Sequence, residues 1–195
     1  MRVTVAQRRA ADGEASSAVR RILRRHADFH GITDRDEVLN QPSGAPYCTL
    51  SEAHISLSHD EDWVAAATST APVGVDIQHA INVSPRFIRR LGCISTTEAA
   101  ASWCVREAIA KVRGKGLSDA PWRYDLNINQ PHGQFQEVFW LCVPLRNTTF
   151  LAAASTRPCV LVLQEVPDDD IRSADTHIPG PDHQRSPRPC RLDPL

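Results

Sequence analysis

Features that mark several large classes of protein are missing from this sequence of 195 residues. No apolar run approaches the ~20 residues that a membrane-spanning helix needs, so we expect no membrane protein. The opening residues, MRVTVAQRR, contain no apolar signal core, and we therefore expect a cytoplasmic protein. The formal net charge is only −1, so no global electrostatic field favours a nucleic acid or an anionic membrane as partner.

Signatures of several kinds of site are absent as well. No two of the six cysteines have C-x-x-C spacing, which argues against a zinc or redox site. With 42% hydrophobic residues, the chain is long enough to bury a core without disulfides, and we expect reduced thiols. There is no H-E-x-x-H, no G-x-x-x-x-G-K-S/T and no G-x-G-x-x-G, and no nucleophile-elbow sequence surrounds Ser58.

Lysine is nearly absent. Of the 22 basic residues only two are lysines, Lys111 and Lys115, and all the others are arginine. A lysine carries a compact point charge, whereas arginine carries a planar fork of donors. A site that needs the compact form would explain why both lysines lie in one segment, and chance placement is the alternative.

Hydrophobic periodicity predicts both strands and helices, and hence an α+β fold, in two halves. In the first half, residues 1–72, we expect strands at 2–7, 54–58 and 63–69 and helical segments at 14–29 and 33–39. In the second half, residues 73–166, we expect strands at 73–77, 137–145, 149–155 and 159–165 and helices at 85–91 and 96–114. Residues 167–195 contain six of the fourteen prolines, which predicts a disordered tail.

The two halves also begin alike. RVTVAQ opens the first half and VGVDIQ opens the second, and a predicted helix follows each of them. This weak repeat favours two similar halves with a ligand cleft between them.

The long helix of the second half carries a candidate site. It begins with a capping box at 95–98, and Trp103, Glu107 and Lys111 are spaced by four residues along one face. A Glu-to-Lys ion pair on a solvated surface, worth a few tenths of a kcal/mol, is the simpler interpretation. The aromatic on the same face, the rare lysine and the Gly114-Lys115-Gly116 run favour a ligand site instead, because glycines let a backbone approach a ligand closely.

A second candidate is Asp76, which lies in an otherwise apolar strand. An aspartate there is costly unless its charge is compensated, and a divalent metal is one compensation. Gln78 points to the same side of the strand, and Asp76 with Glu107 supplies the hard oxygen donors that magnesium favours. A strand-end aspartate that caps a turn is the alternative.

The third candidate is the Ser58-His59 pair at the end of an alternating strand. A loop at that point could present both side chains to an anion. A lone histidine is more often structural or merely exposed, and that interpretation stays open.

The order of these segments resembles the 4'-phosphopantetheinyl transferases, in particular the Sfp-like group. The order is Gly-x-Pro, Ser-His, Gly-Val-Asp, Trp-x-x-Arg-Glu-Ala-x-x-Lys and Gly-x-Gly-Leu, between Gly44 and Leu117. The resemblance implies two pseudo-symmetric α+β halves, each with antiparallel strands packed on a long helix. It also implies a monomeric enzyme that uses Mg²⁺ and transfers 4'-phosphopantetheine from coenzyme A to a serine of an apo acyl or peptidyl carrier protein.

The resemblance assigns roles to individual residues. Asp76, Glu107 and Gln78 match the metal-binding positions. Glu107 is also the candidate base for the carrier serine, and Lys111 is the expected catalytic contact to the coenzyme A phosphates. The remaining coenzyme A contacts that it implies are Ser58 and His59 at the 3'-phosphate, Gly44 and Pro46 beside the adenine, and Arg20 at the nucleotide phosphates.

The sequence departs from the family pattern at several positions. Gln78 replaces a glutamate, Arg106 replaces a lysine, Ala45 replaces a basic residue, and the segment between Asp76 and Glu107 is short. These departures keep open a non-catalytic relative that binds coenzyme A or a carrier protein. A nucleic-acid-binding module using the arginines at 20–25 is a third hypothesis, against which the near-neutral charge argues. The arginine-rich composition indicates a GC-rich coding sequence, which fits a bacterium with secondary metabolism, so we expect a polyketide or nonribosomal peptide pathway. The sequence does not name the carrier, and fatty-acid, polyketide and peptide-synthetase carriers all stay open.

Overall fold

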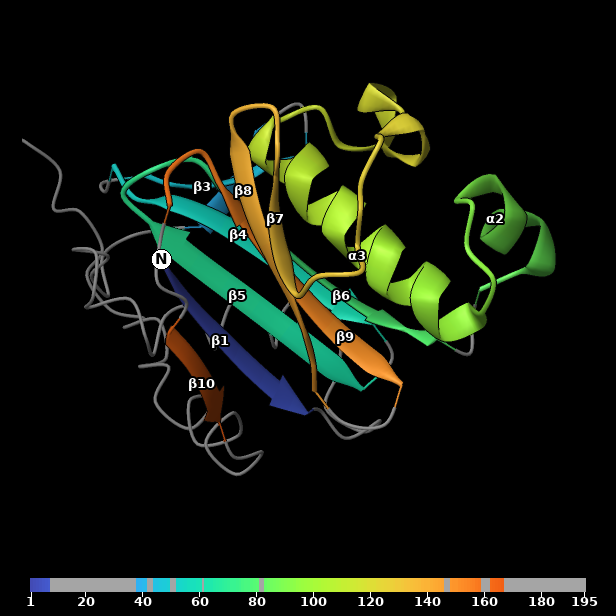
Figure 1. Cartoon of the computed structure of the whole chain (residues 1–195). Helices are drawn as coiled ribbons and strands as arrows, with labels where there is room; N and C mark the ends of the chain where they lie inside the picture. Colours follow the sequence, from blue (N-terminus) through green and yellow to red (C-terminus); the bar gives the residue numbers. More distant parts are fainter. Residues whose placement is uncertain are drawn as a thin grey trace, which may run out of the picture.

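The computed structural model describes residues 1–7, 38–41, 44–49, 52–60, 62–80, 83–145, 148–158 and 162–166. Within them, two four-stranded sheets and a two-stranded sheet are combined with one long helix (Figure 1). No helix of these residues is long and apolar enough to cross a membrane. The combination of mainly antiparallel sheets with one long helix agrees with the predicted α+β class.

The first sheet has the strand order β10-β1-β5-β4. Its strands are β1 (Arg2–Gln7), β4 (His54–Asp60), β5 (Trp63–Ser69) and β10 (Val162–Val166). β1 pairs antiparallel with β5 and parallel with β10, and β4 pairs antiparallel with β5. A strand from near the end of the described chain thus lies beside its first strand.

The second sheet is antiparallel throughout, with the order β6-β9-β8-β7. Its strands are β6 (Val73–His79), β7 (His132–Phe135), β8 (Val138–Pro144) and β9 (Thr149–Ser155). The two-stranded sheet consists of β2 (Val38–Asn40) and β3 (Pro46–Cys48), and β3 contacts β4.

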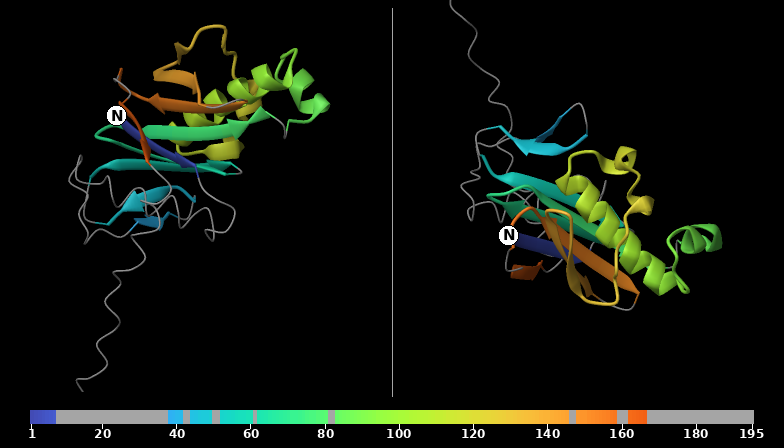
Figure 2. Two further views of the ribbon diagram at one scale, coloured as in Figure 1. Left: turned by 90° about the horizontal axis from the view of Figure 1, so that it is seen from below. Right: turned by 45° about the horizontal axis from the view of Figure 1, so that its top comes forward.

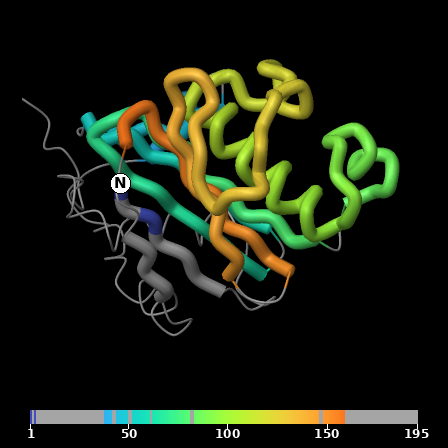
Figure 3. The backbone as a smooth tube through the Cα atoms, viewed as in Figure 1, coloured from blue at the N-terminus to red at the C-terminus, as the bar shows by residue number. Residues whose placement is uncertain are grey.

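The helix α3 (Thr96–Val112) lies across β6, β9 and β8 (Figures 1 and 2). A short helix, α2 (Pro85–Arg90), precedes it, and two 3-10 turns, η3 (Gly116–Asp119) and η4 (Pro121–Arg123), follow it before the chain returns to β7 (Figure 3). As predicted, the Ser95 hydroxyl caps α3 by accepting from the Glu98 N–H. Gly114 follows the helix with a φ of +67°.

Strand periodicity divides the second sheet into two packed faces. Ala152 and Ala154 of β9 belong to the cluster that α3 covers, whereas Leu151 and Ala153 pack with residues of β1 and β5. At Gly74 the helix comes so close that an added Cβ would lie 1.9 Å from the Ala108 carbonyl oxygen. Asp76 and Gln78 lie two and four residues after Gly74, so they share its helix-facing side of β6.

The two large sheets meet along their edge strands, β4 and β6. Side chains of β4 bind the outward-facing N–H groups of β6, which have no partner within their own sheet. The Val75 N–H donates to Ser56 Oγ at 3.0 Å, and the Ile77 N–H donates to Ser58 Oγ at 3.2 Å. The His79 N–H donates to the Asp60 carboxylate. We call this row of contacts the β4–β6 seam.

Most of the predicted elements are confirmed, with some differences. The strands β3 and β7 were missed, and the predicted helical segment at 33–39 is wrong where it is described, since 38–40 form β2. The predicted helix at 14–29 and the tail at 167–195 lie outside the described residues. Pseudo-symmetric halves with a long helix in each, and the boundary at residue 72, therefore stay predictions.

The cysteines can be compared with the expectation of reduced thiols. Cys48, Cys93, Cys104 and Cys142 form no disulfide. The other two cysteines lie outside the described part of the chain.

Candidate functional site

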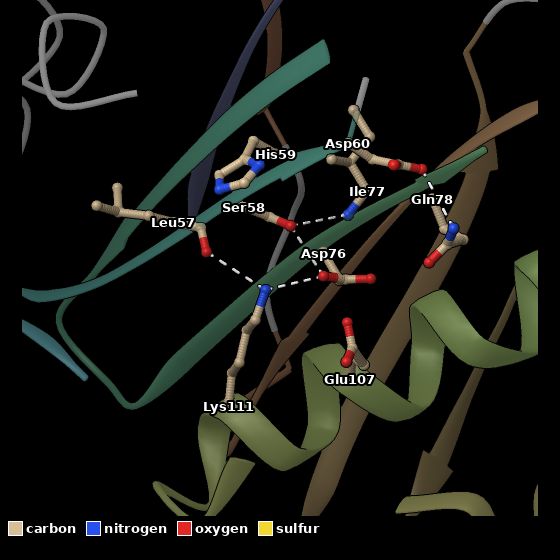
Figure 4. A pocket seen from close by; sticks show the side chains of 9 residues that line it. All are labelled: Leu57, Ser58, His59, Asp60, Asp76, Ile77, Gln78, Glu107 and Lys111. Atoms are coloured by element: carbon tan, nitrogen blue, oxygen red, sulfur yellow. Dashed lines mark hydrogen bonds and ion pairs between the residues drawn. The ribbon is translucent and has the colours of Figure 1, made fainter. Parts of the chain in front are cut away.

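The candidate site is a polar cavity of about 250 Å³ between β4, β6 and α3 (Figure 4). Its lining residues are Leu57, Ser58, His59, Asp60, Asp76, Ile77, Gln78, Glu107 and Lys111. The structure thus brings together six residues singled out from the sequence, although they come from three separate elements.

Asp76 lies at the centre of the site and is only 2% exposed. Its Oδ1 accepts hydrogen bonds from Ser58 Oγ and Lys111 Nζ, both at 2.8 Å. Its Oδ2 is buried and has no hydrogen-bond partner among the described residues. Because an unpaired buried carboxylate oxygen is costly, this atom points to a ligand or a shared proton.

Lys111 uses its ammonium group to join the two sheet edges at the site. In addition to Asp76 Oδ1, Nζ donates to the carbonyl oxygen of Val75 at 2.8 Å and to that of Leu57 at 3.3 Å. Three acceptors match the three N–H donors of a lysine. Lys111 therefore compensates the charge of Asp76 and bridges β4 and β6.

Glu107 faces Asp76 from α3 (Figure 4). Burial and the nearby Asp76 carboxylate raise the pKa of Glu107 to about 8, although Lys111 acts in the opposite direction. Glu107 therefore retains its proton at neutral pH when no cation is bound.

Gln78 lies beside this carboxyl pair and is held by its amide nitrogen. Nε2 donates to Asp60 Oδ2 and to the His79 carbonyl oxygen, each at 3.2 Å. Figure 4 shows the amide oxygen on the side toward Glu107. The predicted third metal-binding position therefore presents an oxygen to the cavity.

Ser58 and His59 project differently, as adjacent residues of a strand do. Ser58 is buried, and its hydroxyl is bound to Asp76 and to the Ile77 N–H. His59 is exposed at the rim of the cavity, and in Figure 4 its ring points away from Asp76. Of the predicted pair, His59 is the one that presents its side chain to solvent.

The remaining predicted residues lie elsewhere. Gly44 and Pro46 do not line the cavity, and Arg20 lies outside the described residues. Trp103 packs edge-on against Phe87 of α2, with ring centroids 4.7 Å apart, and thereby anchors that short helix to α3.

Arg106, next to Glu107 in the motif, is buried away from the cavity. Its guanidinium donates to the Ser102 carbonyl oxygen and to the Tyr124 carbonyl oxygen, at 3.3 and 3.0 Å. It thus ties α3 to the residue that follows η4, a role for which the planar fork of arginine is suited.

Of the three lining residues that we did not predict from the sequence, Asp60 is the one with a charged side chain. A signal was present, because Ser56, Ser58 and Asp60 alternate along β4 and so share one side of that strand. What the sequence did not show is that this side faces the edge of β6.

The donor atoms fit a magnesium ion shared with a substrate. Asp76 and Glu107 offer two carboxylates, and Mg²⁺ favours one or two carboxylates completed by waters and phosphate oxygens. Among the described residues, no group of three or more His, Cys, Asp or Glu is placed to hold a metal ion. The arrangement therefore suits an ion that substrate oxygens help to bind, and not a closed metal site.

Comparison with known proteins adds a partial similarity. No family model matches the chain. Over 78 residues, 33% of this chain and 34% of the relative, the sequence is 31% identical to the 4'-phosphopantetheinyl transferase psf-1 of Bacillus pumilus. The chain thus spans about a third of the length of the curated relative it matches. Over that third, the similarity supports the resemblance seen in the motifs.

Proposed function

We propose that this protein is a magnesium-dependent 4'-phosphopantetheinyl transferase that modifies a serine of an apo acyl or peptidyl carrier protein. One observation carries the proposal. Asp76 of β6 and Glu107 of α3 meet in one polar cavity, where a buried Asp76 oxygen has no partner among the described residues. The partial similarity to psf-1 supports the same activity.

The reaction needs charge stabilisation more than covalent help. The serine oxygen of the carrier forms a bond to the β-phosphorus of coenzyme A, and the bond from that phosphorus to 3',5'-ADP breaks. A magnesium ion held by Asp76, Glu107 and the Gln78 amide oxygen would neutralise charge on the pyrophosphate.

The residues of the chain supply the rest. Glu107 can accept the serine proton directly or through a water, because its carboxyl group lines the cavity. Lys111 adds a positive charge to the wall of the cavity, with its side chain 30% exposed. Ser58 holds Asp76 Oδ1, which leaves Oδ2 for the cation.

Mass spectrometry of apo carrier proteins after incubation with coenzyme A and Mg²⁺ tests the proposal. We expect one carrier, of the polyketide or peptide-synthetase type, to gain the mass of a single phosphopantetheine arm, and to gain none when EDTA replaces Mg²⁺. Absence of transfer to fatty-acid, polyketide and peptide-synthetase carriers alike would refute it.

A non-catalytic coenzyme A-binding relative is the second candidate, and one observation favours it. Gln78 places an amide where the family pattern has a glutamate, so the cavity offers a metal ion one carboxylate fewer. Calorimetry that detects coenzyme A binding, together with no transfer to any carrier, would favour this candidate.

A further inference from the structure

Asp60 lines the same cavity as Asp76 and Glu107, but the proposed reaction gives it no task. We propose that Asp60 is a positioning residue, which fixes the Gln78 amide so that its oxygen faces Asp76 and Glu107. The use of that oxygen as a metal ligand rests on the proposed function, whereas the orientation of the amide does not.

The hydrogen bonds of Gln78 determine which way its amide points. Its nitrogen has two N–H donors, and the two acceptors within reach are Asp60 Oδ2 and the His79 carbonyl oxygen. If the amide were reversed, its oxygen would face a carboxylate and a carbonyl, and neither of these groups can donate. The amide oxygen must therefore point away from Asp60, as Figure 4 shows.

Asp60 can fix this orientation because it is itself held in the β4–β6 seam. The Oδ2 atom that accepts from Gln78 also accepts from the His79 N–H of β6. At the two preceding positions of the seam, serine hydroxyls accept from Val75 and Ile77. Asp60 occupies the third position, and its Oδ2 atom accepts one hydrogen bond from the backbone of β6 and another from a side chain of β6.

The same contacts explain why a neutral residue stands at position 78. A glutamate there would place a second carboxylate against Asp60 Oδ2 and the His79 carbonyl oxygen, and like charges in contact are unfavourable. Asp60 Oδ2 already accepts from the Gln78 amide and from the His79 N–H, so the role that this geometry gives Asp60 is to hold Gln78 and not to bind the ion. Asp60 acts through Gln78, and the two positions depend on each other.

A charge-swap experiment tests this dependence. Mn²⁺ affinity is measured by electron paramagnetic resonance for the wild type, Asp60→Asn, Gln78→Glu and the double variant. We expect Gln78→Glu to bind Mn²⁺ about tenfold more tightly than the double variant, because its two facing carboxylates repel each other in the metal-free protein and a bound cation relieves that repulsion. Asp60→Asn should stay within about twofold of the wild type, because its amide oxygen still accepts hydrogen bonds. Equal affinities of Gln78→Glu and the double variant would overturn the inference.

Gln134→Glu is the matched control for the added charge. Gln134 is an exposed residue of β7 whose Nε2 donates to the Gln136 carbonyl oxygen at 2.7 Å, and it does not line the cavity. Its Mn²⁺ affinity should equal that of the wild type. A change in affinity at Gln134→Glu as large as that at Gln78→Glu would show a general charge effect and contradict the proposal.

Nuclear magnetic resonance of the metal-free protein tests the orientation without relying on a metal. The Gln78 side-chain amide protons should exchange slowly with solvent in the wild type and in Asp60→Asn, and at least roughly tenfold faster in Asp60→Ala. Unchanged exchange in Asp60→Ala would overturn the positioning role. If the wild type binds no Mn²⁺ but Gln78 exchange still depends on Asp60, the proposed metal function fails and the positioning role stands.

Discussion

Two sides of α3 use charged residues in different ways. Toward the cavity, Glu107 and Lys111 remain partly exposed and surround an Asp76 oxygen that has no partner among the described residues. Toward the 3-10 turns, Arg106 is 5% exposed and binds backbone carbonyl groups of its own fold. Two charged residues that are adjacent in one sequence motif therefore have different roles: Glu107 lines the cavity, and Arg106 stabilises the fold.

The largest effect should come from the cavity side. Glu107→Ala removes a proposed metal ligand and base, and we expect the transfer rate to fall by roughly 10²–10⁴-fold. Initial rates of carrier modification would measure this loss. Secondary structure followed by circular dichroism should match that of the wild type, and full activity of the variant would remove the role given to Glu107.

On the other side, Arg106→Lys should affect folding and leave the chemistry intact. One ammonium group cannot reach both Ser102 and Tyr124 as the guanidinium does, so we expect a loss of about 1–3 kcal/mol in the free energy of unfolding. Urea unfolding would measure it. A variant as stable as the wild type but inactive would place Arg106 in the site after all.

The stability of the metal-free protein should depend on pH through Glu107. Its pKa rises from 4.5 to about 8 on folding, so the folded state retains a proton that the unfolded state has lost between these values. The free energy of unfolding should therefore decrease from pH 5 to pH 8. Thermal melts across this range should show the decrease in the wild type and a flatter profile in Glu107→Gln. Identical profiles for the two proteins would contradict the raised pKa.

The smallest effect separates the two lysines. Lys115 is 59% exposed, and its Nζ lies 3.8 Å from Asp119 Oδ1, a surface pair of modest value. Lys115→Gln should change the free energy of unfolding by less than ~0.5 kcal/mol and leave transfer unchanged. Lys111→Gln, examined in the same assays, should lower both stability and transfer. If the two variants behaved alike, the distinction between cavity and surface lysine would be lost.

The fold was predictable where local patterns decide it. Alternation placed β1 correctly and located β4 as far as Ser58, because successive side chains of a strand point to opposite faces. The capping box located the start of α3 for a similarly local reason. β7 was missed, since Phe135 is the one large hydrophobic side chain among its four residues and its pairing with β8 is what holds it in place.

Most residues of the candidate site could be predicted from the sequence, but the groups that they contact could not. Asp76, Glu107 and Lys111 were identified from an aspartate in an apolar strand and from helical spacing. The neighbouring Arg106 gave no sign that it faces the 3-10 turns, because the packing of α3 on the second sheet sets its direction. Asp60 was overlooked because its effect depends on β6, which comes later in the chain.

The sequence alone determined the α+β class, the face that Glu107 and Lys111 share, and the unusual aspartate at 76, because these depend on spacing within one element. Only the tertiary structure decided that the edges of two sheets meet, that Ser56, Ser58 and Asp60 bind the backbone of β6, and that Asp60 orients Gln78. The reason is that edge strands have unpaired N–H groups whose partners depend on which other edge lies beside them.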